Sequence, residues 1–150
     1  ALQAQKDTAA PIDLSGLSSL TDLNCLLFPL PRLPTSLVGL SIFLWSDADF
    51  SHLTAATMMR VLLMEDARLT FPTCLKSLQV VGEGKLLDSN VGDLALEKYD
   101  HSNADPLTLE DLEKLPQTIR EIYGTFDPPS LEEGLGEIFP LLERVMCESF

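Results

Sequence analysis

The feature that most constrains this chain is an apolar frame that recurs along nearly its whole length. Positions 1, 4 and 6 of each frame are filled by Leu, Ile, Val, Met or Cys, with Gly once at the last of them. The frames are Leu20-Leu23-Cys25, Leu37-Leu40-Ile42, Met59-Leu62-Met64, Leu75-Leu78-Val80, Val91-Leu94-Leu96, Ile119-Ile122-Gly124 and Leu142-Val145-Cys147. Their first residues are separated by 17, 22, 16, 16, 28 and 23 residues. A period of about 20 residues indicates supersecondary units that stack on one another, because one unit alone cannot bury its apolar face.

Each frame predicts a β-strand whose side chains at positions 4 and 6 face the same way, with position 1 entering from the preceding bend. Parallel stacking of such strands would merge these residues into one core and leave the alternate positions on an open sheet face. We therefore expect nearly complete burial at positions 4 and 6. The residues concerned include Leu40, Ile42, Leu62, Met64, Leu78, Val80, Leu94 and Leu96.

Apolar-proline pairs precede several frames, and proline suits an extended entry into a strand because its φ is fixed and its nitrogen carries no hydrogen. The pairs are Leu33-Pro34, Phe71-Pro72, Leu115-Pro116 and Phe139-Pro140. Between frames, helical signals predict short convex elements over residues 51–59, over 109–115 after the capping residue Thr108, and after Ser130. Turns are expected at 82–84 and 88–90, and a polar surface loop at 100–106.

Three segments carry a more specific pattern. Residues 33–42 read Leu-Pro-Thr-Ser-Leu-Val-Gly-Leu-Ser-Ile, residues 71–80 read Phe-Pro-Thr-Cys-Leu-Lys-Ser-Leu-Gln-Val, and residues 115–123 read Leu-Pro-Gln-Thr-Ile-Arg-Glu-Ile-Tyr. They resemble the short leucine-rich repeats of the LP-x-x-L-x-x-L-x-V type, which occur in bacterial secreted effectors and in irregular protozoan repeat proteins. The resemblance covers roughly residues 17–150. It implies a solenoid with a concave parallel sheet, short convex helices or turns, and a role in protein recognition.

The chain departs from that type at position 9, where the family has an Asn that ties neighbouring turns together. Here the position holds Phe28, Trp45, Ala67, Glu83, Tyr99, Asp127 and Phe150. The expected fold is an α/β leucine-rich-repeat solenoid that forms a single domain over residues 1–150, with residues 1–12 as a flexible lead or the edge of a cap. The alternative is a compact α+β domain in which the same residues form ordinary core strands and helices.

Charge bears on the choice of partner. The formal net charge of −13 should repel nucleic-acid phosphates and anionic lipid surfaces, so a basic protein is the partner that fits best and direct binding to nucleic acid is not expected. Residues 25–45 are very apolar, but Pro29, Pro31, Arg32 and Pro34 interrupt them, so no membrane span is expected.

The cysteines indicate a compartment. Cys25, Cys74 and Cys147 cannot all pair within the chain, and they lack the close spacings of a zinc site or a disulfide scaffold. We expect all three to be unpaired and structural, with Cys25 and Cys147 buried at equivalent frame positions. A reducing, intracellular and specifically cytoplasmic location follows as the expectation.

Catalytic chemistry is not expected, and neither is a cofactor or a metal. Residues 82–85 read Gly-Glu-Gly-Lys, but a phosphate-binding loop needs four residues between its glycines and Ser or Thr after the lysine, and a turn explains them better. His52 and His101 lack any nucleophile context and are interpreted as solvated surface histidines. Asp47 and Asp49 precede a helix-like segment without the glycine and glutamate of a calcium loop.

The predicted function is that of a non-catalytic protein-protein interaction module, which binds a partner on its exposed sheet face. Odd frame positions mix apolar anchors with acidic residues, which is typical of an interface core with charge selectivity. The predicted contact residues are Asn24, Phe43, Leu63, Glu65, Gln79, Val81, Glu97, Tyr123 and Met146. A shift of register by one residue would instead make them core. The alternative function is that of a structural subunit embedded in a larger assembly.

Overall fold

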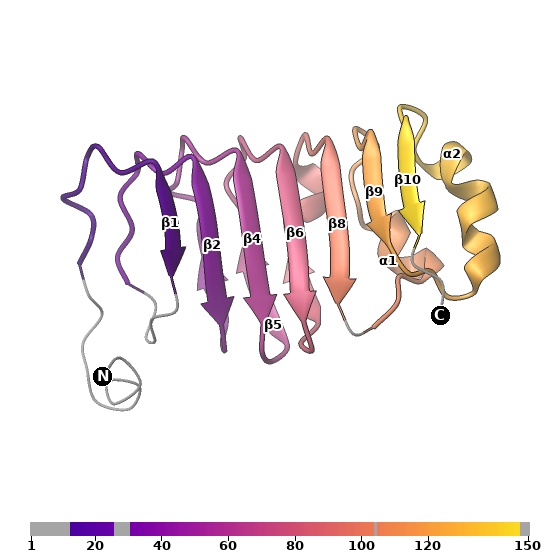
Figure 1. The fold of residues 1–150 in the computed structure, drawn as a ribbon, viewed down its shortest axis with the longest axis horizontal. Helices are drawn as coiled ribbons and strands as arrows, with labels where there is room; N and C mark the ends of the chain where they lie inside the picture. The colour runs from indigo at the N-terminus through magenta and orange to yellow at the C-terminus, as the bar shows by residue number, and fades with distance from the viewer. Residues whose placement is uncertain (1–12, 26–30, 104, 148–150) are drawn as a thin grey trace.

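The chain folds as an α/β protein built around a parallel sheet of seven strands, with few and short helices (Figure 1). The computed structural model describes residues 13–25, 31–103 and 105–147. This coarse architecture confirms the expected class with its parallel sheet. It is compatible both with stacked repeats and with a compact domain.

The seven-stranded sheet forms the front layer in Figure 1. Its strands are β1 (Asp22–Cys25), β2 (Gly39–Leu44), β4 (Met58–Leu63), β6 (Ser77–Gly82), β8 (Lys98–Asn103), β9 (Glu121–Gly124) and β10 (Arg144–Cys147). They are hydrogen-bonded in that order, and all six pairings are parallel. The N-terminal half of the chain therefore lies at one end of the sheet and the C-terminal half at the other.

A second, three-stranded parallel sheet lies behind the first. It consists of β3 (Ala48–Asp49), β5 (Ala67–Thr70) and β7 (Leu86–Ser89). Beyond β7 the rear layer is made of helical turns. They are the 3₁₀ turn η2 (Val91–Asp93), the helix α1 (Leu109–Glu113), the 3₁₀ turn η3 (Pro129–Gly134) and the helix α2 (Leu135–Ile138).

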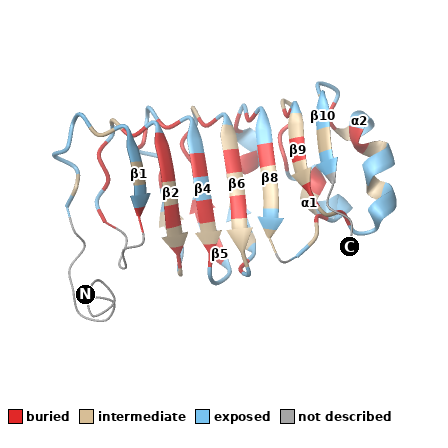
Figure 2. Ribbon diagram, viewed as in Figure 1, coloured by how far each residue is buried: buried red, intermediate tan, exposed pale blue. Residues whose placement is uncertain are grey.

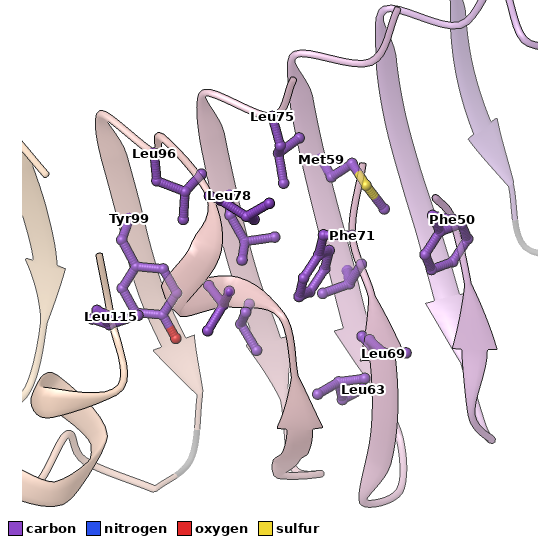
Figure 3. Close-up of a cluster of buried hydrophobic side chains, with 14 of the residues drawn as sticks. Phe50, Met59, Leu63, Leu69, Phe71, Leu75, Leu78, Leu96, Tyr99 and Leu115 are labelled. Carbon is purple, nitrogen blue, oxygen red and sulfur yellow. The ribbon is translucent and has the colours of Figure 1, made fainter. Parts of the chain in front are cut away.

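The core fills the space between the two layers. Along β2 and β6 the burial alternates, as expected for strands with one face on a core, and Leu40, Ile42, Leu78 and Val80 are all buried as predicted (Figure 2). Phenylalanines from the rear loops complete the packing, and Figure 3 shows Phe50 and Phe71 in one cluster with Met59, Leu63 and Leu78 of the front strands. The core is almost wholly aliphatic and aromatic.

The frame assigned to residues 59–64 was wrong in register. Leu62 is only half-buried and Met64 is 41% exposed, whereas Val61 and Leu63 are fully enclosed. The frame therefore begins at Ala56, three residues earlier. Because strand side chains alternate, an offset of an odd number of residues exchanges the core face for the open face. Alanine at position 1 was too small to stand out in a search for large aliphatic residues.

The frame assigned to residues 91–96 was also misplaced. Leu94 and Leu96 are buried as expected, but they precede β8, and Leu96 is position 1 of a frame continued by Tyr99 and His101. Tyr99 and His101 both face inward, but they are not aliphatic, so a pattern of aliphatic residues does not include them. With both corrections the frame starts are separated by 17, 19, 19, 21, 23 and 23 residues, a smoother series than the sequence pattern alone suggested.

Polar side chains tie successive turns of the chain together, although they do not stand at frame position 9, where the resembled family has its Asn. Asp47 accepts the backbone N–H of Arg68 at 2.8 Å, and Asp66 accepts that of Lys85 at 2.8 Å. The Asn90 amide accepts the N–H of Phe71 at 2.7 Å and donates to its carbonyl at 3.0 Å. These contacts satisfy backbone groups that face no strand partner.

A second series of inter-turn bonds uses the residue just before frame position 1. Ser36 donates its hydroxyl to the carbonyl of Leu20 at 2.6 Å, and Thr118 donates to that of Leu96 at 2.7 Å. Cys74 occupies the equivalent place, and its thiol donates to the carbonyl of Ala56 at 2.9 Å. Each acceptor is position 1 of the preceding corrected frame.

Local predictions between the frames met with mixed results. Residues 51–57 form turns and not the expected helix, whereas Thr108 does cap α1 through a reciprocal bond with Asp111. Ser130 lies inside η3 and makes no cap. Residues 100–103 belong to β8 and not to a loop, and β7 extends through Ser89 into the expected turn at 88–90. A polar segment such as residues 100–103 resembles a loop in the sequence, but it forms a strand here because neighbouring strands satisfy its backbone hydrogen bonds.

Cys25 is a free, buried thiol and Cys74 a free, half-buried one, as predicted. Cys147 ends β10 at the same frame position as Cys25, but its side chain lies outside the described residues, as does the expected lead over residues 1–12. Within the described ranges, none of the helices is long and apolar enough to cross a membrane.

Candidate functional site

No helix or strand of the described residues covers the front of the seven-stranded sheet, and we call its outward positions 3, 5 and 7 of the frames the open sheet face (Figures 1 and 2). Position 3 supplies Asp22, Gly39, Met58, Ser77, Lys98, Glu121 and Arg144. Position 5 supplies Asn24, Ser41, Arg60, Gln79, Asp100, Tyr123 and Met146. Position 7 supplies Phe43, Leu62, Val81 and Ser102. Parallel register places equal positions side by side across the strands.

A shallow depression of about 350 Å³ lies on this face between β1 and β8. Small residues form its bottom, notably Gly39, Ser41 and Ser77. Longer side chains surround it, and they are Asp22, Met58, Arg60, Lys98 and Asp100. The hollow is thus a direct consequence of small residues at positions 3 and 5 of β2 and at position 3 of β6.

An apolar row lies nearer the carboxyl ends of the strands. The register aligns Phe43 with Leu62 and Leu62 with Val81, so three large apolar side chains stand next to one another on β2, β4 and β6. Trp45 extends the row, with its ring centroid 6.1 Å from that of Phe43. Glu83 follows β6 directly and Glu65 lies two residues after β4; both acids are exposed, so the row is bordered by negative charge.

The charges of the face differ between its two ends. Just before β8, β9 and β10, Arg120 lies 3.7 Å from Glu97 and 3.0 Å from Glu143, so these border charges are engaged with one another. On the face itself Arg144 of β10 lies 3.4 Å from Glu121 of β9. Among the described residues no ion pair is recorded for Arg60 or Lys98, which border the depression. The charges able to meet a ligand therefore lie over β2 to β8.

Six of the nine predicted contact residues lie on the open sheet face. They are Asn24, Phe43, Gln79, Val81, Tyr123 and Met146. Asn24 and Met146 are on the two terminal strands, far from the apolar row, and Met146 is 54% exposed. The structure brings together only Phe43, Gln79 and Val81 among them, over β2 and β6.

Three predicted contact residues lie elsewhere. The prediction that Leu63 contacts a partner was wrong, because its side chain is wholly buried in the core. The error came from the register assigned to its frame. Glu65 is exposed but stands in the turn after β4, and Glu97 is exposed at the residue before β8 and faces Arg120. Neither acid is part of a strand.

Sequence reasoning missed the centre of the face. Met58, Arg60 and Leu62 alternate with the buried side chains of β4, and Asp100 does so on β8. Residues 58–64 are apolar except for Arg60, so Arg60 was the one local signal that position 60 and its alternate neighbours face outward. For β8 no apolar pattern existed, since His101 fills an inward position.

A second, larger cleft of about 860 Å³ opens on the rear of the molecule between β7 and α1. Tyr99 and His101 of β8 line it, and the Tyr99 hydroxyl lies 2.9 Å from Nδ1 of His101. Nε2 lies 2.8 Å from the carbonyl of Asp105 and must donate, because a carbonyl only accepts. His101 is therefore no solvated surface histidine, which corrects that prediction, whereas His52 is exposed as expected.

Burial shifts the titration of this pair. Desolvation lowers the pKa of His101 against the opposing effect of Asp105, Asp111 and Asp100, and desolvation likewise raises the pKa of the Tyr99 hydroxyl. Both groups are thus held neutral near pH 7. In the described part of the chain no three His, Cys, Asp or Glu side chains are grouped so that they could hold a metal ion.

Comparison with models of protein families, with curated proteins and with solved structures found no match for this chain. The case for a function therefore rests on the geometry of the two surfaces.

Proposed function

We propose that this protein is a non-catalytic interaction module, which binds a protein partner on its open sheet face. The observation that carries the proposal is the joint occurrence, over β2 to β8, of the apolar row, the shallow depression and the charges of Arg60 and Lys98, which form no ion pair with any other described residue. Apolar anchors beside unpaired polar groups are typical of an interface core. A face that served only as a solvated surface would have little reason to align Phe43, Leu62 and Val81.

The chemistry of the face specifies the partner. Its apolar row calls for apolar side chains in the partner, and Glu65 and Glu83 at the border call for basic ones. Arg60 and Lys98 favour an acidic group over the depression. The net charge of −13 for the whole chain would speed the approach of a partner that is basic overall.

We also propose that the chain is a leucine-rich-repeat solenoid of the short type. Three features support this assignment: the strand order follows the chain, the corrected frame starts are 17 to 23 residues apart, and polar bonds recur between successive turns. In such a solenoid the sheet is the usual recognition surface. The free thiols Cys25 and Cys74 support a reducing, intracellular location.

Photo-crosslinking in cells tests the proposed surface. A photoreactive phenylalanine analogue replaces Leu62 in one variant and Leu109, which is 47% exposed on the rear, in a control variant. We expect one protein to be crosslinked from position 62 and not from 109. That protein, once purified, should bind the parent chain, and Leu62→Glu should weaken binding by about tenfold or more, whereas Leu109→Glu should not.

Two kinetic changes follow from the charges. Glu65→Lys together with Glu83→Lys should slow association with the basic partner and reduce its dependence on salt, while Tyr123→Ala, at the self-paired end of the face, should have the smaller effect. Indifference of binding to Leu62→Glu, with an unchanged circular dichroism spectrum, would remove the face from consideration. Recovery of the chain only as a stoichiometric complex would instead favour a structural subunit.

A further inference from the structure

The rear sheet ends abruptly while the front sheet continues. Its order is β3-β5-β7, and the next turn of the chain supplies α1 where a fourth strand would stand. Residue Leu107 pairs with Phe126 further along and not with β7. Alternate residues of a strand direct their N–H and C=O groups to opposite sides, so β7 presents backbone donors and acceptors on the side away from β5.

No strand of the described residues pairs with this side of β7, which we call the free edge, and the rear cleft lies against it. Leu86, Leu87 and Ser89 of β7 line one wall, and Asp111 and Lys114 line the wall formed by α1. At about 860 Å³ the cleft falls in the size range of ligand-binding clefts. Four residues of β7 offer an edge of about 13 Å, at about 3.3 Å a residue, which is the length of a short extended segment.

The floor of the cleft is aromatic and needs no polar partner. Tyr99 and His101 bond to each other, and Nε2 of His101 donates to the carbonyl of Asp105. Their ring centroids are 5.8 Å apart. In Figure 3 the Tyr99 ring extends from β8 into the interior beside Leu115. An apolar side chain can therefore rest on this floor without displacing a hydrogen bond.

The charges around the cleft leave an acidic excess. Lys85 pairs with Asp105 at 3.9 Å and Lys114 with Glu110 at 3.6 Å. Arg68 pairs with Asp88 at 3.5 Å. Asp111 and Asp127 also line the cleft, and no ion pair is recorded for either within the described residues. The complementary occupant carries positive charge.

We propose that this cleft binds an extended segment of another protein, which adds to β7 as a fourth strand and alternates apolar with Lys or Arg side chains. The backbone of the segment bonds to the free edge, its apolar side chains face Tyr99 and His101, and its basic ones approach Asp111 and Asp127. This site is separate from the open sheet face and does not depend on the function proposed for it.

Capped synthetic heptapeptides test the proposal by NMR titration of the intact chain. The first probe alternates Lys and Val, and the second alternates Glu and Val. Two further probes have the Lys-Val sequence with N-methyl groups on alternate residues, one blocking the N–H groups along one edge of the peptide and the other blocking those along the opposite edge. We expect the Lys-Val peptide to bind saturably in the millimolar range or tighter and to slow amide exchange within Leu86–Ser89. The Glu-Val peptide should bind about tenfold more weakly, and one of the two N-methylated peptides should not bind.

Two variants separate the cleft from other surfaces. Leu87→Trp, which fills the cleft at an exposed position, should abolish binding, whereas Leu141→Trp at another exposed position should not. Asp127→Asn should weaken the Lys-Val peptide alone. Absence of binding into the millimolar range, equal binding of all N-methylated peptides, or binding that ignores Leu87→Trp would overturn the proposal. Leu62→Glu should leave the peptide titration unchanged. A failed proposal for the cleft can therefore be told apart from a failed proposal for the open sheet face.

Discussion

Leu78 illustrates what the core residues contribute. It lies at position 4 of β6, between β4 and β8, with no exposed surface. The residues aligned with it on the adjacent strands, Met59 and Tyr99, are buried too, so its methyl groups are enclosed on both sides. A large loss of volume there leaves a cavity that the surrounding strands cannot close.

We expect Leu78→Ala to lower the free energy of unfolding by about 2–5 kcal/mol, through lost burial and a residual cavity. Urea denaturation followed by circular dichroism measures it. Val38→Ala serves as the control, because Val38 is 41% exposed and should change the midpoint little. Equal midpoints for Leu78→Ala and the parent chain would contradict the assignment of Leu78 to the core.

His101 makes stability depend on pH in a predictable direction. Burial lowers its folded-state pKa below the unfolded value of about 6.5, so the unfolded chain binds more protons within that interval. The contribution of neutral His101 is complete above about pH 6.5 and declines as the pH falls toward the folded pKa. Below that pKa the decline ends.

Replacement of His101 by Gln should flatten this part of the profile, since Gln keeps a donor for the carbonyl of Asp105 but does not titrate. The measurement is the free energy of unfolding at a series of pH values from about 7 downward through the window that begins near 6.5. His52→Gln, at an exposed site, should leave the slope unchanged. Parallel profiles for the parent and His101→Gln would refute the buried, neutral histidine.

At the scale of elements, short strands are held in line by bonds between successive turns as well as by the sheet ladder. Ser36, Cys74 and Thr118 precede frame position 1 in three different turns, and each donates to the preceding turn's position 1 carbonyl. The residue type varies while the donor is kept. The position just before frame position 1 therefore requires a hydrogen-bond donor, and either a hydroxyl or a thiol can serve.

Cys74→Ser should accordingly keep the free energy of unfolding within about 0.5 kcal/mol of the parent, whereas Cys74→Val should lower it by about 1 kcal/mol because the carbonyl of Ala56 loses its donor. Thr118→Val should cost a similar amount at the equivalent place. Thermal and urea unfolding of the three variants decide this. If serine and valine at position 74 are equally tolerated, the thiol is filling space and not donating.

At the scale of the whole molecule, charge is distributed unevenly. On the open sheet face at positions 3 and 5, Arg60, Lys98 and Arg144 are matched in number by Asp22, Asp100 and Glu121, although the chain as a whole carries −13. The excess lies at the turns and on the rear, for example at Glu132, Glu133 and Glu137. Self-repulsion of that excess opposes the compact state.

Added sodium chloride should therefore raise the melting temperature, because it screens repulsion between exposed carboxylates. Scanning calorimetry over a range of salt concentrations measures the effect. The triple variant Glu132→Lys, Glu133→Lys and Glu137→Lys is less acidic and should show a smaller rise. A melting temperature that falls with salt would indicate that the ion pairs outweigh the repulsion.

Local apolar periodicity was enough to predict parallel strands, most of the core and the short helix after Thr108. In β2 and β6 the strand and its inward face follow from the sequence alone, because Leu40 and Ile42, and likewise Leu78 and Val80, alternate with the polar residues Ser41 and Gln79. The unpaired state of Cys25 and Cys74 followed from their number and spacing. Six of the nine predicted contact residues reached the open face for the same reason of alternation.

Tertiary structure alone decided the rest. Ala56 begins a frame because neighbouring strands enclose it, and His101 faces inward because Tyr99 and the Asp105 carbonyl satisfy its ring, and neither circumstance is visible in a local pattern. Whether Leu63 faces the core or the open sheet face depends on the frame that begins at Ala56. The rear cleft exists because α1 replaces a fourth strand beside β7, a contact between segments distant in the chain. Periodicity specifies which side chains must be buried, whereas only the folded chain determines which backbone edges and polar groups remain free to bind.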